Sequence, residues 1–402
     1  MRLTRMRERK PMTLRVVHVV QAMGEDDGIS NAVRNMLRAQ ADGRVDATLL
    51  VGRWTPYQSG QLADVAGVRA LPMRRLASGR LGDLLSYPQD FLRVLSELAL
   101  QADVVHLHGL WRYPSLVGAW AIRRIGVPYV TSPHGVLTRE ALRHNRLRKL
   151  VAFHLIERRT LVRSSAVVAT SADERDALLA LGIPARNLVV IPLAVDVQRL
   201  VPLAAARWAK ISSQRRRIAL VVSRLHSIKR IVELVAAFAT VSSEYPQWDL
   251  VIVGREDERG YAERIGDEIN RNSLASRVRV AGARAPDDLH ESYASAHLFV
   301  LPSASENFGL VVAEALAAGL PVITTTGAPW REVIWSRSGW RVEPTVRSLA
   351  QALRSAFALT DHERHQMGLR GQRLVWERYS LTTLGTRLMD LYATVKKETV
   401  PG

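Results

Sequence analysis

The feature that most constrains this fold is a repeated alternation of short, continuously apolar runs with helical segments. In the front part of the chain such runs lie at residues 14–20, 47–52, 103–109, 127–135, 165–171 and 187–193. In the rear part they lie at residues 218–224, 249–254, 277–282, 297–301 and 321–325. Apolar strands that alternate with helices are typical of parallel sheets covered on both faces. The sequence therefore predicts an α/β protein.

The alternation weakens over residues 194–216, and the segment 212–217 (SSQRRR) is polar. A chain of 402 residues has room for two domains, and we place the boundary in this weak region. We predict two Rossmann-like, doubly wound domains that face each other across a cleft, over residues 12–200 and 201–378. Residues 379–402 form a final helical segment.

The stretch from Leu301 to Pro321 holds Glu306 and Glu314 eight residues apart. The pattern places Glu306 on a loop, Gly309 where the loop becomes a helix, and Glu314 more than a turn into that helix. Amides at a helix start can bind a phosphate, and carboxylates accept hydrogen bonds from sugar hydroxyls. The stretch thus favours a nucleotide diphosphate carrying a sugar. The alternative is an amphipathic helix with two solvated glutamates, which is the commoner meaning of this spacing alone.

Two cations, Arg224 and Lys229, follow the first strand of the second domain. The carboxyl end of a parallel strand is where open α/β sheets bind ligands. There the two cations would neutralise a departing diphosphate. Taken alone, they are also compatible with two solvated charges that precede a helix.

Together these motifs resemble glycosyltransferase family 4, the retaining nucleotide-sugar transferases of GT-B fold. The resemblance is carried by SRLHSIKR at 223–230, SENFGLVVAEALAAGLPVI at 305–323 and GAPW at 327–330, with HLHGLW at 106–111, SPHG at 132–135 and VIPLAVD at 190–196. It runs along nearly the whole chain. It implies the GT-B fold, with the helix of residues 379–402 packing back on the first domain.

The resemblance also implies roles for the matching residues of the second domain. Arg224 and Lys229 would bind the diphosphate. Glu306 would contact hydroxyls of the donor sugar, and Glu314 those of the ribose. Further donor contacts would come from Gly282, Ala283, Asn307, Phe308, Gly309 and Leu310, and from Gly28 of the first domain. At one of these the chain departs from the family, because Asp27-Gly28 replaces its usual Gly-Gly pair.

Histidines supply the expected contacts from the first domain. By the resemblance, His134 would approach the donor sugar and His108 would lie on the acceptor side. We expect His106 and His108 to point to opposite faces of their strand, one of them a hydrogen-bonded core residue. We expect His18 in the core.

We expect no metal cofactor. The sequence has no Asp-x-Asp and no HExxH motif, because His362 and His365 have the wrong spacing, and it has no cysteine. The nucleotide-diphosphate sugar would be a co-substrate, and its leaving group already has a cationic site. The resemblance implies a retaining reaction in which the acceptor attacks from the face that the diphosphate leaves.

A net charge of +18 favours acidic partners. Residues 138–163 carry eight basic groups against two acidic ones, interspersed with apolar residues. We interpret this segment as a basic amphipathic helix that lies on an anionic membrane surface, with a solvated domain helix as the alternative. No apolar run is long enough to span a membrane. We therefore predict a cytoplasmic protein, peripheral on the inner face of the plasma membrane.

The favoured function is transfer of a hexose from a UDP- or GDP-linked sugar to a hydroxyl of a glycan acceptor. A lipid-linked acceptor in bacterial surface polysaccharide synthesis is preferred, by family analogy. Within the same fold, one alternative is a transferase that acts on a soluble small-molecule acceptor. Another is a different reaction, that of an epimerase or an inverting transferase. A non-enzymatic protein that binds nucleic acid or an anionic surface has only the charge in its favour, because no nucleic-acid-binding signature is found.

Overall fold

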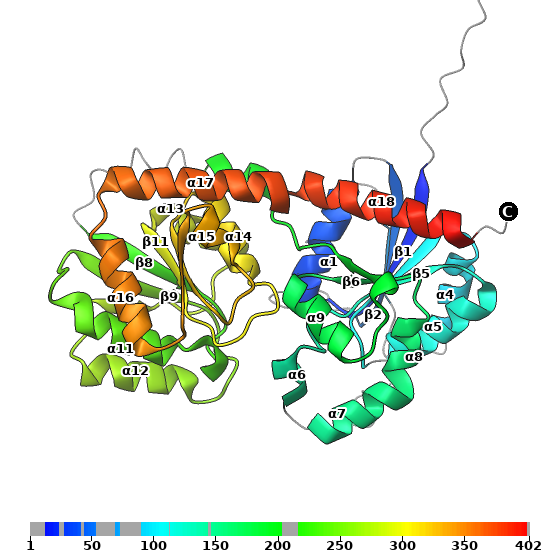
Figure 1. Cartoon of the computed structure of the whole chain (residues 1–402), viewed down its shortest axis with the longest axis horizontal. Helices are drawn as coiled ribbons and strands as arrows, with labels where there is room; N and C mark the ends of the chain where they lie inside the picture. The colour runs from blue at the N-terminus through cyan, green and yellow to red at the C-terminus, as the bar shows by residue number, and fades with distance from the viewer. Residues whose placement is uncertain are drawn as a thin grey trace, which may run out of the picture. The chain divides into compact units, whose positions relative to one another are not determined.

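The computed structural model describes residues 13–23, 28–41, 44–53, 69–72, 90–111, 113–143, 146–202 and 216–399. The chain divides into two compact units (Figure 1). Unit 1 comprises residues 1–192 together with 384–402, and unit 2 comprises residues 193–383. The boundaries that we placed after residues 200 and 378 lie eight and five residues from these divisions, which follow residues 192 and 383.

Unit 1 is built on a parallel sheet in the order β3-β2-β1-β4-β5-β6-β7. Its strands are β1 (Leu14–Ala22), β2 (Val45–Arg53), β3 (Arg69–Pro72), β4 (Val104–His108), β5 (Tyr129–Ser132), β6 (Ala166–Ala169) and β7 (Leu188–Val190). The winding reverses between β1 and β4, which are neighbours in the sheet but distant in sequence. Such a reversal leaves a crevice at the carboxyl ends of the strands.

Several helices pack against this sheet. The described helices of unit 1 are α1 (Gly28–Ala39), α4 (Asp90–Ala99), α5 (Tyr113–Ile125), α6 (Arg139–Arg143), α7 (Arg146–Ala152), the π-helix η2 (Phe153–Glu157), α8 (Arg158–Val162), α9 (Ala172–Ala180), the short η3 (Ala185–Asn187) and α18 (Leu381–Thr399). Strand residues such as Val17 and Leu107 are buried with Phe91 and Leu95 of α4. From residue 384 onward α18 belongs to unit 1, and its Tyr392 is buried.

Unit 2 repeats the same architecture with the order β10-β9-β8-β11-β12-β13, also parallel. Its strands are β8 (Arg217–Val222), β9 (Trp248–Val253), β10 (Val278–Val280), β11 (Leu298–Leu301), β12 (Val322–Thr325) and β13 (Gly339–Val342). Here the winding reverses between β8 and β11.

The helices of unit 2 are η4 (Ser227–Lys229), α11 (Ile231–Ser242), α12 (Tyr261–Arg271), α13 (Pro286–Ser295), α14 (Leu310–Ala317), α15 (Glu332–Trp335), α16 (Val346–Phe357) and α17 (Asp361–Tyr379). One core cluster joins α11, α12 and α16 to the sheet. At its centre Trp248 stacks on Phe357, with ring centroids 4.2 Å apart.

The expected strands are all present, with ends shifted by a few residues. Two strands were missed, β3 and β13, and both are edge strands, which lack the fully apolar pattern of central ones. The interpretation of residues 138–163 as helical agrees with the described residues there. Helix α6 covers Arg139–Arg143, and α7, η2 and α8 run without a break from Arg146 to Val162, with a π-helical turn at Phe153–Glu157.

Helix α17 packs very closely on α14 in unit 2 (Figure 1). A side-chain carbon at Gly368 would lie 2.0 Å from the carbonyl oxygen of Gly319, just after α14. One at Gly371 would lie 2.7 Å from the Leu316 side chain. Gln372 Nε2 also donates to the Ala317 carbonyl at 2.9 Å. The contact therefore depends on glycine at the α17 surface, and it braces the helix that begins at Gly309.

Replacing Gly368 with alanine should destabilise unit 2 by about 1–3 kcal/mol, because the new methyl group meets backbone that cannot move aside cheaply. The matched control is Gly266→Ala in α12, where a side-chain carbon meets no atom within 4 Å. That change should stabilise by roughly 0.5–1 kcal/mol through helix propensity. The measurement is the melting temperature by circular dichroism. Equal effects of the two substitutions would contradict the close packing of α17 on α14.

Candidate active site

A buried ion pair lies at the carboxyl ends of β8 and β11, where the sheet of unit 2 reverses its winding. Lys229 Nζ is 2.5 Å from Glu306 Oε1, and the two side chains are 11% and 12% exposed. Ser303 Oγ donates to the same carboxylate oxygen at 2.7 Å. The reversal point is the position where open α/β sheets bind ligands. A cation and a carboxylate are therefore held together where a charged, hydroxyl-rich ligand would bind.

Backbone contacts hold this loop in place from two sides. The Ala304 amide donates to the Ile228 carbonyl in η4 at 2.8 Å, and the Glu306 amide donates to the Gly327 carbonyl at 2.8 Å. A side-chain carbon at Gly327 would lie 2.3 Å from the Ala304 carbonyl oxygen. The glycine of GAPW is thus required by a close backbone approach, and the approach sets the position of Glu306.

The start of α14 has a left-handed residue, Gly309, with φ +77°. Trp330 of GAPW donates from Nε1 to the Phe308 carbonyl at 2.6 Å. The indole is buried against the rings of Phe308 and Tyr379, with centroids 5.3 and 5.0 Å away. The first amides of a helix have no partner within the helix, and at α14 the first turn is fixed by this aromatic cluster. The predicted loop-to-helix junction at Gly309 is confirmed.

Glu314 lies on the second turn of α14, as its spacing predicted. Its Oε2 accepts a hydrogen bond of 2.8 Å from the hydroxyl of Tyr293, a buried residue of α13. Burial raises the pKa of Glu314, and the bond from Tyr293 opposes that rise. Burial, reinforced by the Glu314 charge, raises the pKa of Tyr293 well above its usual value. Tyr293 therefore orients the carboxylate as a neutral donor, a role that no sequence motif indicated.

The other predicted residues of unit 2 lie at the same edge of the sheet. Arg224 follows β8, and its side chain is half-exposed. Its guanidinium forms an ion pair with the Asp257 carboxylate at 2.5 Å. Gly282 has φ +70° and accepts a 2.8 Å hydrogen bond from the Gly254 amide. Gly254 follows β9, and a side-chain carbon there would lie 1.7 Å from the Ser223 carbonyl oxygen. Ala283 is exposed, and Asn307 and Leu310 are partly buried.

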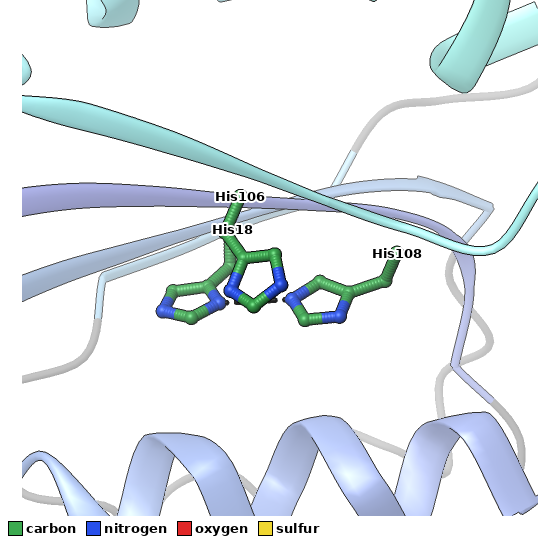
Figure 2. Close-up of side chains that lie close together, drawn as sticks. All are labelled: His18, His106 and His108. Atoms are coloured by element: carbon green, nitrogen blue, oxygen red, sulfur yellow. Dashed lines mark hydrogen bonds between the residues drawn. The ribbon is translucent and has the colours of Figure 1, made fainter. Parts of the chain in front are cut away.

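Three buried histidines of unit 1 form one cluster. His18 of β1 and His106 and His108 of β4 are all buried, and their rings lie on one side of the two strands (Figure 2). The rings of His106 and His108 stack with centroids 4.2 Å apart. The expectation that these two point to opposite faces was wrong, because side chains two residues apart on a strand share a face. The placement of His18 in the core is confirmed.

Hydrogen bonds link the cluster to its surroundings. His18 Nδ1 lies 2.9 Å from His108 Nε2, and His108 Nδ1 lies 3.0 Å from His134 Nε2. His106 contacts the Tyr392 hydroxyl at 2.7 Å and Ser132 Oγ at 2.8 Å. His108 is thus buried behind His134, with both ring nitrogens facing other histidines. Its acceptor-side role stays a prediction.

The two loops that follow β4 and β5 contain strained residues held by buried carboxylates. Trp111 and His134 have φ of +68° and +56°, a conformation unfavourable for residues with a side chain. Glu157 accepts from the Trp111 amide at 2.6 Å, and Glu174 accepts from the amide of Gly135 at 2.5 Å. Burial raises the pKa of Glu157 to about 7. Neither glutamate was predicted, since nothing in the sequence relates them to loops that distant.

Among the described residues, three side chains lie close enough together to hold one metal ion: His18, His106 and His108. Their ring nitrogens lie within 4.8 Å of one another. Imidazole is a common ligand of zinc and other transition metals. Each ring already bonds to another side chain, however, so a metal would have to replace those bonds. The expectation of no metal stays a prediction.

Of the remaining predicted residues, Gly28 is the exposed first residue of α1, and Asp27 lies outside the described residues.

Comparison with known protein families matches both units to glycosyltransferases. Residues 205–373 match the family described as "Glycosyl transferases group 1", and residues 27–194 match "Glycosyl transferase 4-like domain". A GDP-mannose:cellobiosyl-diphosphopolyprenol alpha-mannosyltransferase of Xanthomonas oryzae is 29% identical over 77% of this chain and 78% of its own length. A GDP-mannose-dependent alpha-mannosyltransferase of Mycobacterium tuberculosis is 29% identical over 92% of this chain and 93% of its own.

Solved structures share the fold at low identity. Anabaena Alr3699/HepE in complex with UDP and glucose has a TM-score of 0.76 at 20% identity, covering 95% of this chain and 100% of that one. A sucrose-phosphate synthase of Thermosynechococcus elongatus has a TM-score of 0.73 at 22% identity, covering 96% and 100%. The predicted GT-B fold class is confirmed. With two family matches that together span most of the chain and relatives aligned along its length, this protein belongs to glycosyltransferase family 4 and is a glycosyltransferase.

Proposed function

We propose that this enzyme transfers a hexose, with retention of configuration, from a nucleotide-diphosphate sugar to a hydroxyl of a glycan acceptor. The observation that carries the proposal is the Lys229–Glu306 pair at the reversal point of unit 2, beside the start of α14. A diphosphate needs cations and amides, and a sugar needs hydrogen-bond acceptors. This edge of the sheet offers both kinds of group.

The proposed roles of the residues in unit 2 are those of the family resemblance. Lys229 and Arg224 stabilise the negative charge that develops on the diphosphate as the bond to the sugar breaks. In this proposal the Arg224 guanidinium, which is paired with Asp257 in the structure, gives up part of that ion pair to contact the phosphate. Glu306 accepts from sugar hydroxyls, and Glu314, oriented by Tyr293, accepts from those of the ribose. Remaining donor contacts come from Gly282, Ala283 and the residues around Gly309, and Gly28 of unit 1 is a further proposed donor contact.

The reaction follows a front-face course in this proposal. The bond between C1 of the sugar and the diphosphate oxygen breaks, and the acceptor oxygen bonds to C1 on the same face. The hydroxyl proton passes to a diphosphate oxygen, so neither glutamate has to act as a nucleophile. The positive character on the sugar in the transition state resembles that in glycoside hydrolysis. Because fixed cations receive the leaving group, the proposed reaction needs no metal.

The donor is proposed to be UDP- or GDP-linked. Two relatives are named for GDP-mannose, and a solved structure of the same fold contains UDP and glucose. The acceptor is proposed to be lipid-linked, in a bacterial surface-polysaccharide pathway. Support comes from a relative named for a diphosphopolyprenol acceptor. A relative named mannosylfructose-phosphate synthase supports the alternative of a soluble acceptor.

Replacing Lys229 with alanine should lower kcat/KM by about 10²- to 10³-fold, because the developing phosphate charge loses its buried cation. The matched control is Lys397→Ala on α18, an exposed lysine, which should leave the rate unchanged. The measurement is release of the nucleotide diphosphate at saturating acceptor, with melting temperature as a check on folding. Near-normal turnover in folded Lys229→Ala would count heavily against the assignment.

The donor base is accessible to a thermal-shift panel of UDP, GDP, ADP and their common sugars. A ligand at 100 times its dissociation constant stabilises the folded state by about 2.7 kcal/mol, so the cognate nucleotide should raise the melting temperature by several degrees. The rise should disappear in Lys229→Ala. If no nucleotide shifts the wild-type protein, the proposed donor class fails, and filter binding with and without salt then tests the nucleic-acid alternative.

We further propose that residues 138–163 hold the enzyme on an anionic membrane surface on the cytoplasmic side. Val151, Leu155 and Ile156 are exposed, with Leu155 75% accessible. Exposed Arg148, Arg158 and Arg159 lie in the same segment. Apolar side chains beside basic groups suit the interface of an anionic bilayer. None of the described helices is long and apolar enough to cross a membrane.

The double substitution Leu155→Ser with Ile156→Ser should abolish most co-sedimentation with vesicles of mixed phosphatidylcholine and phosphatidylglycerol, since the apolar contacts are lost. The control is Leu100→Ser, which changes a leucine that is 71% exposed after α4. Added salt should weaken binding of the wild-type protein. Equal binding to vesicles of phosphatidylcholine alone, or no effect of the double substitution, would refute this membrane role.

A further inference from the structure

One buried carboxylate of unit 1 joins the loop after β5 to the start of α9. Glu174 is 1% exposed. Its Oε1 accepts a hydrogen bond of 2.5 Å from the Gly135 amide. Its Oε2 accepts from the Thr170 amide at 2.8 Å and from the Thr170 hydroxyl at 2.7 Å. All three of these contacts come from donors, so they suit an ionised carboxylate, which only accepts.

A glutamate at this position of a helix usually serves its own helix. Glu174 is the third residue of α9, after the N-cap Ser171. The chain has a comparable residue at the start of α17, Glu363, whose carboxylate accepts from the amide and hydroxyl of the N-cap Thr360. Glu363 is exposed, as most glutamates are. Glu174 is instead buried and reaches the amide of a distant loop, which helix capping does not require.

The contacts of Glu174 need two acceptor oxygens. The amides of Gly135 and Thr170 face different oxygens of the carboxylate, and a backbone N–H can only donate. A glutamine side chain has one oxygen and one NH₂ group. Whichever way that side-chain amide turned, one of the two backbone amides would face a second donor. Glutamine therefore cannot hold both segments at once, although it has nearly the same shape.

The peptide that Glu174 holds is the one after His134. A peptide unit is planar, so a hydrogen bond to the Gly135 N–H also fixes the backbone on the carbonyl side of His134. The loop needs this support because two successive residues are left-handed, with φ of +56° at His134 and +82° at Gly135. For a histidine this conformation is unfavourable, and it persists only where the surroundings fix it.

The imidazole of His134 is held as well. Its Nε2 lies 3.0 Å from Nδ1 of His108, and the two rings stack with centroids 5.3 Å apart. His108 is buried on β4, which pairs with β5 through His108 and Ser132. His134 is thus fixed at its ring by β4 and at its backbone by α9. Loss of either support would leave the ring free to move.

We propose that Glu174 is a positioning residue that fixes the peptide after His134 and so holds the imidazole where it meets the donor sugar. The inference rests on the proposed function, and in particular on the expected approach of His134 to the donor. Glu174 acts through the loop and contacts no substrate itself. Its removal therefore slows sugar transfer and leaves nucleotide binding, which the residues of unit 2 provide, unchanged.

Glu174→Gln tests the proposal with little change in shape. Turnover is measured as nucleotide release from UDP-glucose and from GDP-mannose with water as the acceptor, so that no glycan acceptor has to be known. We expect kcat to fall about ten- to one-hundred-fold, because a shift of about 1 Å at a reacting centre has effects of this size. The donor KM, and the rise in melting temperature caused by UDP or GDP, should stay near their wild-type values.

The matched control is Asp176→Asn, which removes the same charge from an exposed residue of α9 and should leave kcat unchanged. A folded Glu174→Gln enzyme with normal kcat overturns the proposal. So does an equal loss in Asp176→Asn, because the effect would then come from charge and not from the hold on Gly135.

Amide hydrogen exchange measures the hold itself without any substrate. Mass spectrometry follows deuterium uptake in peptides that cover residues 132–138 of the full-length protein. Exchange in these peptides should be faster in Glu174→Gln than in the wild-type protein, and Asp176→Asn should match the wild type. Equal exchange in all three proteins would show that Glu174 does not fix the loop, and the proposal would fail.

Two further variants separate this inference from the proposed function. Gly135→Ala strains the same peptide without changing α9, so it should lower kcat similarly, also if Glu174→Gln does not fold. Normal kcat in His134→Gln would remove the role of His134 at the sugar, whatever Glu174 does. If His134→Gln loses activity while Glu174→Gln and Gly135→Ala keep it, that role stands and the positioning by Glu174 is refuted.

Discussion

The structure depends above all on the reversal of winding within each parallel sheet. Helices that leave on opposite sides of the reversal cannot cover the carboxyl ends of the two strands between them, so that edge remains available to ligands. In unit 2 the reversal lies between β8 and β11, and the Lys229–Glu306 pair lies beside it. In unit 1 it lies between β1 and β4, and His18 and His108 lie on those two strands. The same topology thus yields a charged edge in one unit and an imidazole edge in the other.

The loops at these edges are held from behind by groups that take no part in the chemistry. Glu157 and Glu174 accept hydrogen bonds from loop amides in unit 1, next to residues with unfavourable φ. In unit 2, Trp330 holds the Phe308 carbonyl, and Gly327 allows the backbone of two loops to meet. Strained backbone persists only where its surroundings fix it in several ways. This support explains how loops can present side chains accurately enough for group transfer.

Sequence reasoning was strongest where a residue's role follows from its immediate neighbours. The positions of Glu306 on a loop, Gly309 at a helix start and Glu314 on the second turn are local consequences of an apolar strand, a glycine and an alanine-rich helix. It was weakest at sheet edges, where β3 and β13 were missed, and for long-range contacts. Glu157 of η2 accepts a hydrogen bond from the Trp111 amide, 46 positions away, and local periodicity does not reveal such a contact.

By itself, the sequence determined the class of fold, the order of its elements and the family, because apolar periodicity and dense local motifs express short-range physics. Tertiary structure alone decided which side chains meet. It joined Tyr293 to Glu314 across 21 positions and His106 to Tyr392 across 286. It also placed Gln40, His18, His108 and His134 in one row. Such contacts arise when the winding of the sheets brings distant segments together, and a hydrogen bond leaves no periodic trace in the chain.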